Sequence, residues 1–133
     1  ISYAFSASVC IESRTQKQAV AQQNQILLLA PVDFGNKKGL VSLPGTINEV
    51  ENLQKQCLTK GYSVESWTHL KADEYALKSE NLSKYKWLHF ATHGLVDEMH
   101  PDQSRVYLRA DGNKTEDGVL YAAEVYNLQL GAE

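Results

Sequence analysis

The sequence predicts an α/β fold, a doubly wound and mostly parallel sheet with a small β-hairpin insertion. Three observations favour this class. The continuous aliphatic run over residues 25–30 is typical of a strand covered on both faces, as in parallel sheets. Segments with helical and with strand periodicity alternate after that run. Turn-forming residues over 111–118 separate two short β-rich segments, which is the pattern of a hairpin.

The first 24 residues are expected to form a short strand and a helix that lead into the sheet. The strand covers residues 1–6, and the helix runs over 7–21 with Ser6 or Ser8 as its N-cap. The polar, glutamine-rich residues 16–25 are interpreted as a solvated helix end or a loose linker.

A long amphipathic helix is expected between the first two strands of the sheet. Thr46 is a suitable N-cap, and Glu49, three residues later, completes a capping box. Apolar residues at helical spacing continue as far as Lys60, and Gly61 provides the C-terminal stop. Residues 62–68, rich in β-branched and aromatic side chains, then form the second strand.

The third strand, over residues 86–92, is expected to be the central one. A short helix precedes it, capped by Asp73 and running from Glu74 to about Leu82. The alternating pattern over 105–109 indicates an exposed strand that follows it.

The last part of the chain returns toward the sheet. The turn over 111–118 leads back to a strand over 119–121, and a short helix follows over 122–126. Residues 128–130 lead toward another strand.

Charge and hydropathy exclude several function classes. The 133 residues make one domain, and a net charge of −3 with scattered Lys and Arg residues argues against contact with nucleic acid. The longest apolar run, 26–32, is far shorter than the roughly 20 residues that span a bilayer. The start has neither a signal-peptide pattern nor a Met, so we expect a piece of a longer cytoplasmic polypeptide without membrane contact. Cys10 and Cys57 form no Cys-x-x-Cys pair and are expected to be reduced, buried thiols.

The segment 87–94, Trp-Leu-His-Phe-Ala-Thr-His-Gly, carries the candidate chemistry. It has the pattern of an apolar strand that stops at a histidine and a glycine, and open α/β sheets bind ligands beyond the carboxyl ends of their strands. His93 is therefore a candidate general acid and base, with a histidine that merely fills a turn as the alternative. Gly94 has no side chain, so its N–H can approach a carbonyl oxygen as an oxyanion donor.

Two weaker patterns lie near His93. His89 shares a strand face with His93, and these two histidines with Asp97 or His100 allow a metal site, although a packed supporting residue is the favoured interpretation of His89. The acidic loop 97–102 is interpreted as solvated, with a specificity pocket for a basic side chain as the alternative. The glycines between 35 and 45 match no phosphate-binding motif, and no cofactor or metal is expected.

Four segments, in order along the chain, resemble one protein family. They are 1–8 (ISYAFSAS), 43–50 (LPG followed by Glu49 and Val50), 89–94 (HFATHG) and 118–128 (GVLYAAEVYNL). Together they resemble the CHAT domain, a caspase-like cysteine peptidase family often attached to tetratricopeptide repeats. The resemblance covers nearly the whole chain, and HFATHG is its most specific part. It implies that residues 1–133 are the N-terminal portion of one caspase-like domain, with a first strand and helix in 1–24 and the sheet core in 25–133.

The resemblance also implies the chemistry. His93 matches the catalytic histidine of a Cys–His dyad, and Gly94 matches a donor of the oxyanion hole. The family's nucleophile follows a strand that comes after the segment ending at Leu130, in a Ser-Ala-Cys-type motif, and the sequence stops just before it. Neither Cys10 nor Cys57 stands at the matching place.

The expected function follows from this resemblance. The chain is predicted to be the His-bearing portion of a cysteine endopeptidase, inactive without the C-terminal remainder of the domain. That remainder is expected to place a strand beside the one ending at His93. Expected partners are a protein substrate, the remainder itself and upstream tetratricopeptide repeats. A non-catalytic caspase-like scaffold or regulatory domain is the alternative, and a metal-dependent hydrolase using His89 and His93 is a third hypothesis.

Overall fold

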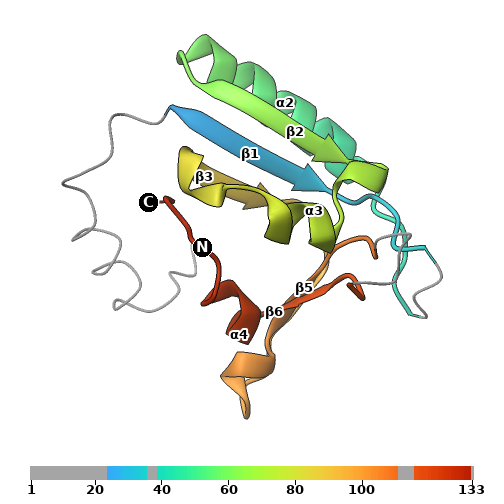
Figure 1. Ribbon diagram of the computed structural model, residues 1–133. Coiled ribbons are helices and arrows are strands. Elements are labelled where there is room, and N and C mark those ends of the chain that lie inside the picture. Colours follow the sequence, from blue (N-terminus) through green and yellow to red (C-terminus); the bar gives the residue numbers. More distant parts are fainter. Residues whose placement is uncertain (1–23, 36–38, 111–115, 133) are drawn as a thin grey trace.

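The computed structural model describes residues 24–35, 39–110 and 116–132 (Figure 1). These residues form layers: helix α2 (Gly45–Thr59) on one side, a parallel sheet in the middle, and short helices with a second, antiparallel sheet on the other side. The strand and helix expected within 1–21 lie outside the described residues. In the part of the chain that is described, no helix has the length and apolar character needed to cross a membrane.

The middle layer is a parallel sheet of three strands in the order β2-β1-β3. The strands are β1 (Gln25–Ala30), β2 (Ser63–Thr68) and β3 (Tyr85–Phe90), close to the predicted segments. The prediction that the third strand is central is wrong for the described sheet, because β1 lies between its two neighbours and β3 forms an edge. The sequence pattern of β3 shows that it is apolar but not which strands flank it.

Strand β1 is buried on both faces. Leu27 and Leu29 face α3 (Glu74–Ser79) and the antiparallel sheet, whereas Ile26 and Leu28 face α2. Burying one such side chain stabilises the fold by about 1.5–3 kcal/mol. This double burial is the reason for the continuous aliphatic sequence of β1.

Helix α2 does not begin with the expected capping box. Pro44 is at the N-cap position, and no side chain caps the helix. The Thr46 hydroxyl instead donates to the Leu43 carbonyl oxygen at 2.7 Å. The carboxylate of Glu49 contacts His89 on β3, with Oε1 2.7 Å from Nε2. The capping-box prediction fails because Glu49 has a partner on a strand that is distant in sequence.

Other helix ends follow their local signals. Gly61 has a φ of +83° just after α2, the left-handed conformation that glycine adopts readily. The Asp73 carboxylate accepts the Ala76 N–H at 2.7 Å and caps α3 as predicted. Helix α3 ends at Ser79, before the predicted end, and a 3₁₀ turn, η3 (Leu82–Lys84), leads into β3.

The second sheet is antiparallel, with strands in the order β4-β5-β6. Its strands are β4 (Gly94–Leu95), β5 (Arg105–Tyr107) and β6 (Val119–Tyr121), and a 3₁₀ turn, η4 (Pro101–Gln103), lies between β4 and β5. Val106 and Leu120 stand opposite each other and pack into the core that Leu27 and Leu29 also form. Helix α4 (Ala122–Val125) follows β6, and residues 128–132 form no strand.

A partly buried network of charges, with Glu74 at its buried centre, joins α3 to the β6–α4 segment. Glu74 is 1% exposed; its Oε1 lies 2.7 Å from Lys78 Nζ, and its Oε2 accepts the Gly118 N–H at 2.7 Å. Lys78 also contacts Glu116 at 2.8 Å and Glu124 at 2.6 Å. Burial raises the pKa of Glu74 above its ordinary value, against the lowering effect of these hydrogen bonds. Burial acts to lower the pKa of Lys78, but its hydrogen bonds to the three glutamates prevail and raise it.

Candidate functional site

His93 lies where the chain leaves the parallel sheet and enters the antiparallel one. Just before it, the Ala91 N–H donates to the Leu29 carbonyl at 2.8 Å, which extends the β1–β3 pairing. The Tyr107 N–H donates to the His93 carbonyl at 2.9 Å, and the Thr92 hydroxyl donates to the Tyr107 carbonyl. Because both sheets hold its backbone, His93 occupies a fixed place at the carboxyl end of β3.

The imidazole of His93 is oriented by the loop that follows β1. Its Nε2 lies 2.8 Å from the Val41 carbonyl oxygen, and its ring centroid lies 5.1 Å from that of the buried Phe34. A carbonyl oxygen only accepts hydrogen bonds, so Nε2 carries the hydrogen, and Nδ1 of the neutral ring carries the lone pair. Among the described residues no hydrogen bond to Nδ1 is found, and Nδ1 is therefore the atom suited to exchange a proton.

Gly94 directs its backbone polar groups away from the antiparallel sheet. It stands opposite Val106, and the Tyr107 N–H bonds the carbonyl of the residue before Gly94. In an antiparallel ladder this arrangement is that of a non-hydrogen-bonded pair, so the Gly94 N–H and C=O point away from β5. A Cβ on Gly94 would meet Arg105 O at 3.5 Å, an ordinary contact, so packing alone does not require glycine here.

The structure does not bring together the residues of the alternative metal site. His89 contacts Glu49 on α2, whereas His93 bonds the Val41 carbonyl. His100 lies in the loop after β4, with Nδ1 3.8 Å from Asp97 Oδ1. Within the described residues, the side chains near enough to share an ion are those of Glu74, Glu116 and Glu124, and the Lys78 ammonium contacts all three.

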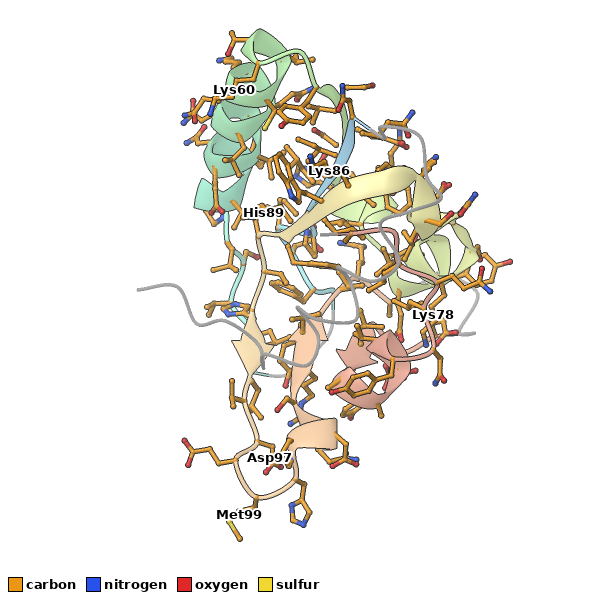
Figure 2. The ribbon with its side chains drawn as sticks, turned by 90° about the vertical axis from the view of Figure 1, so that its left-hand side faces the viewer. Lys60, Lys78, Lys86, His89, Asp97 and Met99 are labelled. Carbon is orange, nitrogen blue, oxygen red and sulfur yellow. The ribbon has the colours of Figure 1, made fainter. Side chains whose placement is uncertain are left out.

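The acidic loop after β4 projects from the body of the protein. Figure 2 shows Asp97 and Met99 at the end of the molecule opposite Lys60. Asp97 Oδ1 accepts the backbone N–H groups of Met99 at 3.0 Å and His100 at 2.8 Å, so this carboxylate stabilises its own turn. Glu98 and Asp102 are exposed. This arrangement fits the interpretation as a solvated loop better than a pocket for a basic side chain.

Cys57 lies far from His93. Helix α2 begins near the carboxyl end of the sheet, where Glu49 contacts His89, and Cys57 is twelve residues after the first residue of α2, Gly45. At 1.5 Å per residue this separation is about 18 Å along the helix. Cys57 is half-buried and packs against the core beneath α2, as expected of a structural thiol. Cys10 lies outside the described residues.

Sequence reasoning missed the residues that orient His93. Val41 acts through its backbone carbonyl, which every residue type possesses, and so no side-chain signal marks it. Asp33 and Phe34 come three and four residues after the end of β1, and the Phe34 ring packs near that of His93. Asp33 pairs with Arg109 through Oδ1 and Nη1. Their position after a buried strand is the one signal that could have indicated them.

The layered α/β fold, with a histidine and a glycine just beyond β3, is compatible with a caspase-like protein. The family model of the CHAT domain matches residues 1–133, and the chain therefore belongs to this caspase-like family. No curated protein and no solved structure matched the chain significantly.

Proposed function

We propose that the chain is the His-bearing portion of a CHAT-type cysteine endopeptidase, which hydrolyses peptide bonds in protein substrates. The observation that carries this proposal is the hydrogen bond from His93 Nε2 to the Val41 carbonyl, 2.8 Å long. It fixes the ring and its tautomer and leaves Nδ1 to serve as the base.

The nucleophile comes from the C-terminal remainder of the same domain, as a strand beside β3. Two features support this route. The described sheet leaves one edge of β3 unpaired. Gly131 also lies directly against the Ser83 carbonyl, just before β3, and Figure 1 shows this last segment on the side of β3 that faces away from β1. A strand parallel to β3 from that point ends beside His93.

In the completed domain, His93 Nδ1 takes the thiol proton and the thiolate attacks the scissile carbonyl carbon. The Gly94 N–H donates to the oxyanion that forms, a contribution on the order of 10²–10³ in rate. The imidazolium of His93 then protonates the leaving amine as the C–N bond breaks, which contributes about 10²–10⁴. Water, deprotonated by His93, hydrolyses the thioester and restores the thiol.

The test uses a polypeptide that carries residues 1–133 followed by the C-terminal remainder, with peptide cleavage measured by mass spectrometry. His93→Ala should abolish cleavage, whereas His100→Ala, at the exposed loop tip, should retain it. Undiminished turnover by His93→Ala contradicts the assignment. Gly94→Val should also lower kcat by obstructing the backbone N–H.

The non-catalytic alternative, a scaffold or regulatory domain, gives a different result in the same assay. The unsubstituted polypeptide then binds its protein partner but cleaves nothing. A protein substrate and upstream tetratricopeptide repeats are the partners that the peptidase proposal implies.

A further inference from the structure

We propose that Val41 and Leu95 form the walls of the substrate site beside His93, and that this site takes peptides with an apolar side chain next to the scissile bond. The inference rests on the proposed peptidase function and names its substrate class. The experiment distinguishes a failure of this substrate preference from a failure of the proposed peptidase function.

Val41 contacts the imidazole through its carbonyl, and Leu95 is the second residue after His93 in the chain. The Val41 carbonyl is 2.8 Å from His93 Nε2, and the Val41 side chain is 70% exposed. The β4–β5 ladder continues back to His93, whose carbonyl accepts the Tyr107 N–H, so the alternation of this paired segment puts the His93 and Leu95 side chains on the same face; Leu95 is 41% exposed. A peptide bond within reach of the imidazole therefore brings its neighbouring side chains against two exposed apolar residues.

Within the described residues, two charged groups on this side of the molecule already have partners. The Arg109 guanidinium is paired with Asp33. Asp97 Oδ1 accepts two backbone N–H groups of its own turn. A charged substrate side chain between Val41 and Leu95 would lose its hydration without gaining either of these counter-charges, which penalises it relative to an apolar one.

Arg105 provides the competing hypothesis. It stands opposite Leu95 in the ladder, and its guanidinium lies over the rings of Tyr107 and Tyr121, at 6.0 and 5.6 Å. Its Nε donates to the Tyr107 hydroxyl at 3.0 Å. These contacts hold Arg105 against its own sheet. If it nevertheless selected the substrate, the preferred side chain would be acidic.

The experiment compares peptides Ala-Ala-X-Ala-Ala, in which X is Leu, Lys or Asp, on the polypeptide completed by its C-terminal remainder. Cleavage is measured as kcat/KM. Binding is measured by fluorescence anisotropy on the same polypeptide with its nucleophile replaced by alanine. Leu should exceed Lys and Asp by about 10²-fold in both measurements. Equal values, or a preference for Asp, overturn the inference. Selective binding of Leu without cleavage instead contradicts the peptidase function alone.

Two substitutions test whether Val41 and Leu95 are the residues that cause the preference for an apolar side chain. Val41→Asp should lower kcat/KM for the Leu peptide by about 10²-fold and raise it for the Lys peptide. Leu95→Asp should act in the same direction and serves as the second test if the first variant does not fold. The matched control is Leu70→Asp, because Leu70 is 69% exposed and lies in the 3₁₀ turn after β2. An unchanged preference in both site variants overturns the proposal.

Discussion

Replacing Gly118 with alanine adds a single methyl group where the backbone leaves no room for it. Gly118 has a φ of +77°, in the left-handed region that favours glycine. A Cβ there would lie 2.6 Å from Ala110 N and 2.7 Å from Leu108 O. Both are backbone atoms, which cannot rotate away as the end of a side chain can. The segment before β6 must therefore move.

The expected cost has two parts. The left-handed conformation costs alanine about 1–2 kcal/mol. Movement of the segment also breaks the hydrogen bonds from Gly118 N to Glu74, 2.7 Å, and from Leu108 N to Gly118 O, 2.9 Å. Leaving a buried carboxylate short of a donor costs about 1–3 kcal/mol. The free energy of unfolding should therefore fall by about 2–5 kcal/mol, a large share of the stability of a typical domain.

Equilibrium urea denaturation, followed by the fluorescence of Trp67 and Trp87, measures this loss. The control is Gly61→Ala, since Gly61 has a φ of +83° but no atom within 4 Å of the added methyl. That variant should lose only the conformational part, about 1–2 kcal/mol. Equal losses in the two variants would refute the role assigned to the contacts and to the Glu74 hydrogen bond.

Two further predictions concern the charged networks. Lys78→Met leaves the buried Glu74 carboxylate without its cation and should lower the free energy of unfolding, measured by urea denaturation, by about 2–3 kcal/mol. This loss is smaller than that for a fully buried ion pair because Lys78 is 22% exposed. The control is Lys84→Met, at a 37% exposed position, which should cost under about 1 kcal/mol; a similar loss in both variants contradicts the burial argument. The Tyr85 hydrogen bond lowers the pKa of Glu65, which gives stability that is present above the unfolded pKa, about 4.3, and lost as pH falls through the folded value. Tyr85→Phe should therefore reduce the loss of stability as the pH falls below about 5, and an unchanged slope speaks against this linkage.

The parts of the fold that local sequence determines were predictable. Strand β1 has the predicted bounds because burial on both faces requires aliphatic side chains throughout. Gly61 and Asp73 mark helix ends because their conformation or side chain acts within a few residues.

Features that depend on distant partners were not predictable in this way. Thr46 and Glu49 match a capping box in sequence, yet Glu49 contacts His89, forty residues away. The edge position of β3 likewise depends on pairing with β1 and on nothing in its own pattern. Helix α3 ends at Ser79 because the backbone of Glu80 is extended. Glutamate has a high helical propensity, so the residue type at this position did not predict the end of the helix.

The candidate site likewise has a part that local sequence predicts and a part that depends on distant residues. His93 and Gly94 were recognisable because a histidine and a glycine at a strand end are informative residue types. The group that orients the imidazole is a main-chain carbonyl at Val41, brought there by the loop after β1. The ring nitrogen left without a protein partner is thus selected by a backbone contact, and Val41 can change its side chain without losing that contact. Under the proposed substrate preference, the side chain at position 41 can therefore vary with the substrate while the orientation of His93 is kept.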